Sequence, residues 1–218
     1  MIKLVIFDMD GVLTSTTDEH FNAWRNLFLK HFEIELDPKL EIKTKGVSRI
    51  DSLNILLDHY QIKCDESKKL ALAHEKNENY QVLIASYDES HRLPGIIRIL
   101  DYLKTKGIKM ALGSASKNGP FLLKALKIES YFDYVVDPSL LKGKPNPDIF
   151  LDAAQHFNLD PKDCMGIEDA VAGVLAIKQA GMIALGVGPE NLTLADYRVK
   201  TLPELSLEVL DLLLKGNL

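Results

Sequence analysis

The sequence predicts an α/β fold in which a doubly wound parallel sheet carries an inserted helical unit. Short, nearly continuous apolar runs alternate with helical segments over most of the chain. One long stretch near the N-terminus breaks this alternation and contains helical segments alone. Continuous apolar runs suit strands covered on both faces, and strand–helix alternation is typical of right-handed βαβ units in a parallel sheet.

The expected strands begin with "IKLVIF" (residues 2–7) and continue in the runs 108–116, 131–137, 163–170 and 182–188. Each later run follows a segment with helical periodicity: "IIRILDYLKTKG", "PFLLKALKI", "PDIFLDAAQHFN" and "AVAGVLAIKQAG". Gly107 and Gly181 stand where two of these helices should end, because glycine readily adopts the left-handed conformation of a helix C-cap. These elements predict a Rossmann-like core.

The helical stretch contains "DEHFNAWRNLFLKHF", "SRIDSLNILLDHY" and "DESKKLALAHEKNENYQVLIASY", with no buried-strand run between them. The chain then returns towards the sheet through "DESHRLPG" (88–95). We therefore expect a catalytic core made of residues 1–15 and 88–218 and an α-helical cap domain made of residues 16–87. The crossings near residues 15 and 88 are natural hinge segments.

Composition restricts the partners of the chain. With 218 residues, a formal net charge of −5 and a pI near 5.7, it offers no basic surface for nucleic acid or an anionic membrane. Cys64 and Cys164 have no metal-ligand spacing, which favours two reduced thiols and a cytoplasmic protein. The N-terminal apolar run is too short for a signal peptide, and no run is long enough to span a membrane. We expect a monomer.

Polar clusters follow the expected strands, and the carboxyl ends of parallel strands meet at one edge of a sheet. Taken singly, an Asp-x-Asp pair suits a solvated turn, and a Glu-Asp pair suits a helix cap. Together, four carboxylates at one edge would repel one another unless a cation lay among them, and oxygen ligands favour Mg²⁺ over Zn²⁺. The expected Mg²⁺ ligands are Asp8, Asp10, Glu168 and Asp169.

Positive and hydrogen-bonding groups are expected at the same edge. "SASKN" (114–118) supplies hydroxyl and amide donors, and "LKGKPNPD" (141–148) supplies Lys142 and Lys144. Such groups suit an anion, for example a phosphoryl group.

Four motifs carry a family resemblance. "FDMDGVLTST", "GSASKNG", "GKPNPDIF" and "GIEDAVAG" resemble, in order, the four motifs of the haloacid dehalogenase-like hydrolase superfamily. The resemblance implies that Asp8 is a nucleophile that becomes an aspartyl phosphate, and that Asp10 acts as general acid and base. It implies that Ser114 and Lys144 hold phosphoryl oxygens, since the Lys-Pro order matches Lys144 rather than Lys142. The second aspartate is absent from the true dehalogenases, so carbon–halogen chemistry is not expected.

Within the expected cap, Ser48 and Arg49 stand at an expected helix start, preceded by Lys45 and Gly46. A helix N-terminus with an arginine fork suits an anion, although a capped helix with a solvated arginine explains the same residues. "KGVSRIDSL", "HFNAW", "KNENY" and "SASKNGPFLL" resemble the β-phosphoglucomutase family. Two residues depart from the family pattern: Ile50 stands where an acidic residue is expected after Arg49, and Gly143 where a serine is often found before Lys144. The resemblance implies that Arg49 holds the non-reacting phosphate.

The resemblance also implies that further cap residues lie by the sugar and the hinge. Purely structural alternatives remain: Trp24 could be an aromatic residue of the hydrophobic core, and Lys76 could be a solvated charge on a helix. The expected substrate-binding residues are His20, Trp24, Lys45, Gly46, Val47, Ser48, Arg49, Ser52 and Lys76 from the cap, and Ser114, Ala115, Ser116, Lys117, Asn118 and Lys144 from the core.

The expected activity is that of an Mg²⁺-dependent phosphomutase, an isomerase that interconverts β-D-glucose 1-phosphate and glucose 6-phosphate. It would act on a hexose phosphate through an aspartyl-phosphate enzyme and a hexose bisphosphate, glucose 1,6-bisphosphate. A sugar-phosphate phosphatase with the same core is the alternative. A non-catalytic phosphosugar-binding protein would not need the Asp8–Asp10 pair, and phosphonate hydrolysis would need Lys45 or Lys76 to form a Schiff base.

Overall fold

The computed structural model describes residues 1–189 and 191–217. Its centre is a six-stranded sheet with the order β3-β2-β1-β4-β5-β6, in which every paired strand is parallel. β1 and β4 are central neighbours, so that their carboxyl ends meet at one point. The strands are β1 Leu4–Phe7, β2 Lys109–Leu112, β3 Tyr134–Val135, β4 Cys164–Glu168, β5 Ile183–Val187 and β6 Tyr197–Val199.

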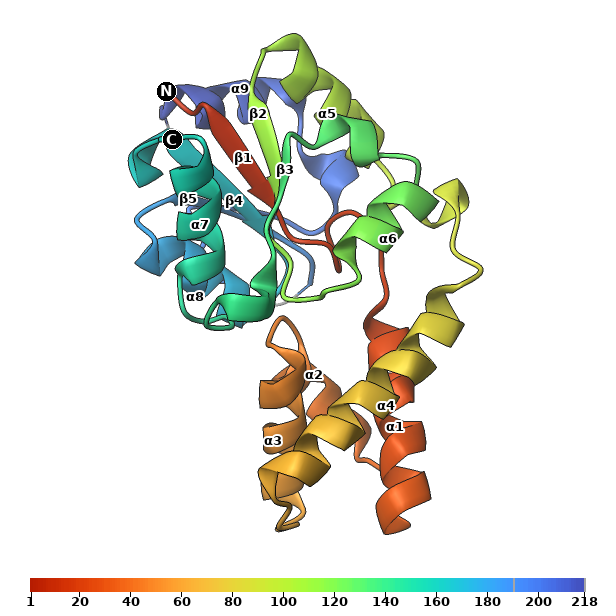
Figure 1. Ribbon diagram of the computed structural model, residues 1–218. Coiled ribbons are helices and arrows are strands. Elements are labelled where there is room, and N and C mark those ends of the chain that lie inside the picture. The colour runs from red at the N-terminus through yellow and green to blue at the C-terminus, as the bar shows by residue number, and fades with distance from the viewer. Residues whose placement is uncertain (190, 218) are drawn as a thin grey trace.

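Helices cover both faces of this sheet (Figure 1), as the doubly wound prediction required. Val5 and Phe7 of β1 point into the apolar cluster shared with α5, α6 and α9, while Leu4 and Ile6 point into the cluster shared with α7 and α8. The helices are α5 Ile96–Thr105, α6 Gly119–Ala125, α7 Asp148–His156, α8 Val171–Gln179 and α9 Leu207–Lys215. α5 and α8 end before Gly107 and Gly181, both at positive φ, as expected for these glycines.

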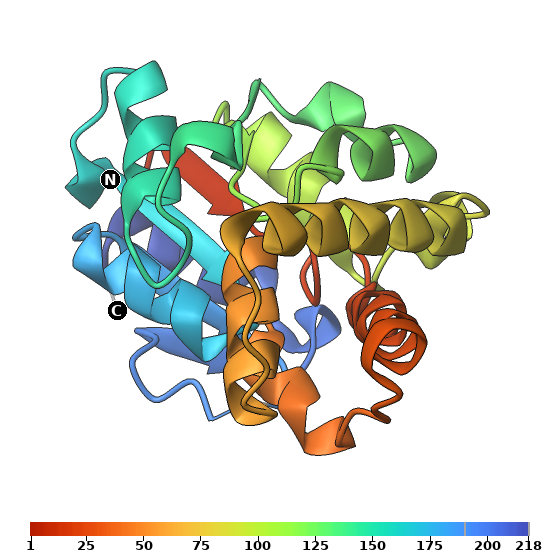
Figure 2. The same ribbon diagram turned by 60° about the horizontal axis from the view of Figure 1, so that its bottom comes forward.

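Four further helices form a separate unit beyond the carboxyl ends of the strands (Figures 1 and 2). They have their own apolar cluster, to which α1 contributes Trp24 and α3 contributes Leu53. The short α2 was not predicted, because four residues carry no readable periodicity. The helices are α1 Thr17–Phe32, α2 Glu41–Thr44, α3 Arg49–His59 and α4 Glu66–Ile84.

The two segments that join the units lie side by side. The backbone N–H of Leu93 donates to the Leu13 carbonyl at 2.9 Å, and the Thr14 hydroxyl donates to the His91 carbonyl at 2.7 Å. The Tyr87 hydroxyl donates to the Ser15 carbonyl at 2.9 Å. These bonds hold the outgoing and returning chains together up to residue 15.

Among the helices that the structure describes, none has the length and apolar character needed to cross a membrane.

Candidate active site

Three buried carboxylates meet where β1 and β4 end. Asp8 follows β1, Glu168 is the last residue of β4, and Asp169 comes next. Their ligand oxygens lie within 4.8 Å of one another. Buried oxygens at this spacing fit a hard divalent cation, so the donor set suits a metal. The Asp10 carboxylate is not part of this cluster.

Two lysines, one from each structural unit, reach this cluster. Lys144 Nζ lies 2.7 Å from Asp8 Oδ1 and 2.9 Å from Glu168 Oε2, and it is buried. Lys45, in the loop before α3, places its Nζ 3.0 Å from Asp169 Oδ2. Burial by itself lowers the pKa of Lys144, but the two carboxylates outweigh it and raise that pKa. Lys144 therefore stays charged inside the cluster.

The carboxylates pay an electrostatic penalty in these positions. Burial, followed by the charge of Asp8, raises the pKa of Glu168 to about 8. Burial raises the pKa of Asp169 to about 7, although Lys45 lowers it. A bound cation would favour the ionised forms of both groups.

Two motif glycines make room for the same carboxylates. A Cβ atom on Gly173 of α8 would lie 2.0 Å from the Glu168 carboxyl carbon. A Cβ atom on Gly11, whose φ is +69°, would lie 1.7 Å from Asp169 Oδ2. Any larger residue at either position would displace a carboxylate from the cluster.

Asp10 directs its side chain towards the segment that leads into the helical unit. Its Oδ1 accepts a hydrogen bond from the backbone N–H of Thr16 at 3.2 Å and another from the Thr16 hydroxyl. That hydroxyl is also 2.9 Å from the Tyr80 hydroxyl. Burial, followed by the negative charge of Asp8, raises the pKa of Asp10 to about 6, even though the Thr16 bonds lower it. A carboxyl group with this pKa can both give and take a proton near neutral pH.

A buried lysine–histidine pair lies beside Asp10. Lys76 Nζ is 2.6 Å from His20 Nδ1 and packs over the rings of Trp24 and Tyr80, at 5.1 and 4.8 Å from their centroids. Burial lowers the pKa of His20 well below its usual value, so the imidazole is neutral and its Nδ1 accepts from Lys76. His20 Nε2 then carries the proton, 3.7 Å from Asp10 Oδ2.

Lys76 is 2 % exposed, which excludes the alternative of a solvated helix charge. Burial, followed by the charge of Arg49, lowers the pKa of Lys76 to about 7, although Asp10 raises it. Trp24 belongs to the apolar cluster of the helical unit and also borders the space described next, so both interpretations of this residue hold.

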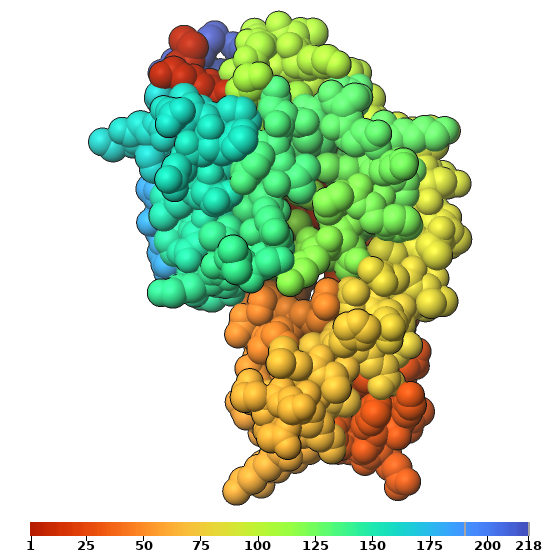
Figure 3. Space-filling view, viewed as in Figure 1, coloured from red at the N-terminus to blue at the C-terminus, as the bar shows by residue number. Residues whose placement is uncertain are grey.

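A cavity lies between the two units. Figure 3 shows the loop before α3 approaching the sheet unit at its lower edge. Gly46 of this loop lies so close that a Cβ atom would be 2.7 Å from Ala170 Cβ. The cavity is lined by Asp8, Asp10, Ser114, Ala115, Ser116 and Asp169 from the sheet unit, and by Thr17, His20, Phe21, Trp24, Glu41, Thr44, Lys45, Gly46, Val47, Arg49, Ser52 and Lys76.

The start of α3 presents Arg49 to this cavity. Ser48 is the N-cap, and its hydroxyl oxygen accepts from the Asp51 N–H at 3.2 Å. Arg49 is half-buried, and its Nη2 donates to Asn77 Oδ1 at 2.7 Å. The capped-helix alternative is therefore right for Ser48, whereas a merely solvated Arg49 is wrong.

With this geometry in place, comparison with known proteins decides the family. The family described as haloacid dehalogenase-like hydrolase matches residues 2–181. The chain belongs to the haloacid dehalogenase-like hydrolase family. The family resemblance and the α/β fold expected from the sequence are thus confirmed.

Individual relatives of this family member include mutases and phosphatases. The chain is 44 % identical to the β-phosphoglucomutase of Bacillus subtilis, over 96 % of this chain and 94 % of the relative. The crystal structure of a β-phosphoglucomutase from Clostridium difficile superposes with a TM-score of 0.94 at 40 % identity, covering 99 % of this chain and 98 % of the other. A fructose-1-phosphate phosphatase of Escherichia coli is 32 % identical over 84 % of this chain and 95 % of its own.

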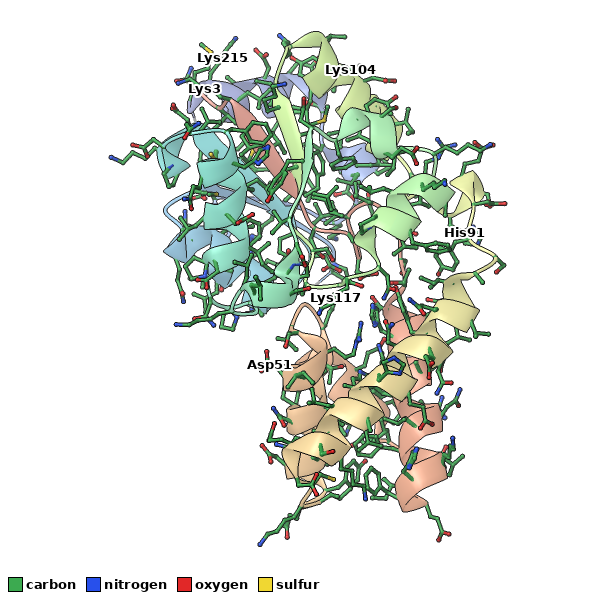
Figure 4. The ribbon with its side chains drawn as sticks, viewed as in Figure 1. Lys3, Asp51, His91, Lys104, Lys117 and Lys215 are labelled. Atoms are coloured by element: carbon green, nitrogen blue, oxygen red, sulfur yellow. The ribbon has the colours of Figure 1, made fainter. Side chains whose placement is uncertain are left out.

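Several expected residues of this haloacid dehalogenase-like protein lie outside the cavity lining. Lys144 and Glu168 are buried behind it, and Lys144, not Lys142, reaches the carboxylates. Lys117, labelled in Figure 4, is exposed at the edge of the sheet unit. Ser48 caps its own helix, and Asn118 bonds to residues of α4.

Several residues that line or support the site were not predicted from the sequence. Thr17 and Phe21 could have been found, since they share the face of α1 that carries His20 and Trp24. Thr16 lies in the quoted motif "FDMDGVLTST", Asn77 and Tyr80 lie in "KNENY", and Gln81 follows directly. Their contacts were not predicted, because these depend on how α4 packs. Of the two departures from the family pattern, Ile50 packs against the apolar cluster of the helical unit, and Gly143 lies against Ser48.

Proposed function

We propose that the chain is an Mg²⁺-dependent phosphomutase that interconverts β-D-glucose 1-phosphate and glucose 6-phosphate through an aspartyl phosphate and glucose 1,6-bisphosphate. The observation that carries the proposal is a single cavity bordered by Asp8 of the carboxylate cluster and by the guanidinium of Arg49. A bisphosphate needs an anion site at each end. Arg49 would supply one, and Lys144 with a cation held by the carboxylates would supply the other. The 44 % identity to a β-phosphoglucomutase supports the same conclusion.

In the proposed reaction Asp8 attacks the phosphoryl group and becomes phosphorylated. Mg²⁺ held by Asp8, Glu168 and Asp169, with the backbone carbonyl of Asp10, would neutralise part of the charge between nucleophile and phosphoryl oxygens. Lys144 and Ser114 would hold the phosphoryl oxygens, and Lys144 keeps its charge for this purpose within the cluster.

Asp10 serves as the general acid and base. It gives a proton to the departing sugar oxygen and takes one from the hydroxyl that next attacks the phosphoenzyme, which a pKa of about 6 permits. The Thr16 bonds fix the position of its carboxylate, and the neutral His20 offers an N–H nearby. The bisphosphate formed in the first half of the cycle must turn end for end before the second half.

We propose that residues 16–87 act as a cap whose closure keeps water from the phosphoenzyme. The close approach of Gly46 to Ala170 supports a closed arrangement of this kind. A sugar-phosphate phosphatase remains the second candidate, favoured by the 32 % identity to a fructose-1-phosphate phosphatase that shares the family's core.

One assay separates the two candidates. The protein is incubated with Mg²⁺, β-glucose 1-phosphate and a trace of glucose 1,6-bisphosphate, and glucose 6-phosphate is measured against free phosphate. A mutase forms mainly the isomer, whereas stoichiometric phosphate without isomer would leave only the phosphatase. Asp8→Asn should abolish the phosphoenzyme in intact-mass spectra, and continued turnover would overturn the assignment of the nucleophile.

We also propose a cytoplasmic monomer. Both cysteines are free thiols, which suits a reducing compartment. Size-exclusion chromatography with light scattering tests the monomer directly, since a mass of 24.4 kDa is expected.

A further inference from the structure

Three side-chain amides connect the cap to the core beside Arg49. Asn77 Oδ1, on α4, accepts from Arg49 Nη2 at 2.7 Å and from Asn118 Nδ2, at the start of α6, at 3.0 Å. Gln81, one turn further along α4, donates from Nε2 to Asn118 Oδ1 at 3.0 Å. We call Asn77, Gln81 and Asn118 the amide bridge. It joins two helices that belong to different structural units.

We infer that Asn77 is a positioning residue that holds Arg49 and Asn118, donors from opposite sides of the domain boundary, ready for the phosphate that is not reacting. Gln81 is a second positioning residue, which fixes the orientation of the Asn118 amide. This inference rests on the proposed function, because a second phosphate site is needed only if the substrate passes through a bisphosphate.

The number of N–H donors on Arg49 and Asn118 indicates that Asn77 positions these side chains without using up the donors that a phosphate needs. A guanidinium has five N–H donors and a primary amide has two, and Asn77 accepts one from each. The remaining donors are left for an anion. Because an amide oxygen is neutral, it holds the half-buried Arg49 without cancelling its positive charge, which a carboxylate at the same position would do.

The role of Gln81 follows from the two ends of the Asn118 amide. Asn118 is 6 % exposed and occupies the N-cap position of α6, yet its side chain makes no capping bond to that helix. Its oxygen faces Gln81 and its nitrogen faces Asn77. Without the Gln81 donor only the Asn77 oxygen would orient the Asn118 amide, so the N–H left for a phosphate would be held less firmly.

The test compares Asn77→Ala, Asn77→Asp and Gln81→Leu with a matched control, Asn79→Ala. Asn79 lies on the same helix, two residues from Asn77 and therefore on another face. Asn77→Ala should raise the KM for β-glucose 1-phosphate about tenfold, as expected for losing a hydrogen bond to a charged group. Phosphorylation of Asp8 by acetyl phosphate, which lacks a second anionic end, should stay unchanged, and so should both readouts in Asn79→Ala.

The two remaining variants distinguish positioning from structural support. Asn77→Asp keeps an acceptor for both donors, so it should preserve thermal stability while still raising KM, because its charge neutralises Arg49. Gln81→Leu replaces an exposed side chain and should raise KM by about threefold without loss of stability. Loss of stability with unchanged KM would show that the bridge is merely structural and would overturn the inference.

A binding measurement separates this inference from the proposed function. Glucose 1,6-bisphosphate is titrated by calorimetry into Asp8→Asn protein, which cannot accept a phosphoryl group, with and without Asn77→Ala. We expect about tenfold weaker binding in the double variant. Equal binding overturns the amide bridge even if the wild type is a mutase. A wild type that forms no isomer overturns the mutase proposal, while the tenfold difference would still support the bridge.

Discussion

Gly143 lies where the core loop before α7 meets the first turn of α3. A Cβ atom added there would lie 3.0 Å from Ser48 Cβ and 3.1 Å from Asp51 Oδ2. The loop cannot easily retreat, because the next residue, Lys144, donates to Asp8 at 2.7 Å and to Glu168 at 2.9 Å. We therefore predict that Gly143→Ala pushes the cap away from the core.

The magnitude follows from these distances. Carbon atoms in contact prefer about 3.5–4.0 Å, so the first turn of α3 must move by about 0.5 Å or more. Overpacking of this kind costs about 1 kcal/mol or more, which lowers the population of the closed arrangement about fivefold relative to the open one. Since closure is proposed to exclude water, the ratio of glucose 6-phosphate to free phosphate should fall by a similar factor.

The assay measures both products from β-glucose 1-phosphate in parallel for wild type, Gly143→Ala, Ser48→Gly and the double variant. Ser48→Gly removes the Cβ that the new methyl group meets, and glycine is tolerated at an N-cap at a cost of a few tenths of a kcal/mol. The double variant should regain most of the lost ratio. An unchanged ratio in Gly143→Ala, or no recovery in the double variant, would refute the contact as a determinant of closure.

Three further outcomes are expected. Thr16→Val removes a hydrogen bond that lowers the pKa of Asp10, so that pKa should rise above about 6 and the acidic limb of kcat/KM should move to higher pH; an unmoved limb would mean that another group controls it. The pKa of Lys76 is about 7 in the folded protein and 10.5 in the unfolded chain. The unfolded chain therefore binds more protons between these pH values, and the stability of the wild type should rise with pH over that range. The free energy of unfolding in urea should therefore exceed that of wild type most in Lys76→Met near pH 7, and the difference should shrink towards pH 10. A difference that grows towards pH 10 would contradict the low pKa of Lys76. Because protons compete for Glu168 and Asp169, whose pKa values are about 8 and 7, calorimetric affinity for Mg²⁺ should weaken as pH falls from about 8 to 6; pH-independent binding would place the ion elsewhere.

The parts of the fold that were predicted are those with strong local signals. β1, β2, β4 and β5 are short and almost wholly buried, so they read as continuous apolar runs. β6 was missed because three residues with an exposed Arg198 carry no such run. α9 was also missed, although its Ser206 N-cap and its end before Gly216 are readable helix signals.

The candidate site divides in the same way. The proximity of Asp8, Glu168 and Asp169 could be predicted from the sequence, because the carboxyl ends of strands in a parallel sheet share an edge. The contact between Thr16, which bonds to Asp10, and Tyr80 could not be predicted. Tyr80 lies 64 positions along the chain from Thr16 and meets it only because α4 packs beside α1. The amide bridge has the same origin. Contacts across a domain boundary depend on packing, which local sequence patterns do not encode.

The position of Asp10 ties its chemistry to the cap. The paired hydrogen bonds of the crossing segments hold residues 13–15 to the returning chain, so we expect any rotation of the proposed cap to be concentrated just beyond Ser15. Thr16, the next residue, supplies both hydrogen bonds that orient the Asp10 carboxylate and contacts Tyr80 of the cap. A cap movement that displaces Thr16 must therefore also displace or release Asp10. If Asp10 moves the proton as proposed, it would be oriented only when the cap is correctly placed, and the same arrangement would limit proton delivery to water while the cavity is open.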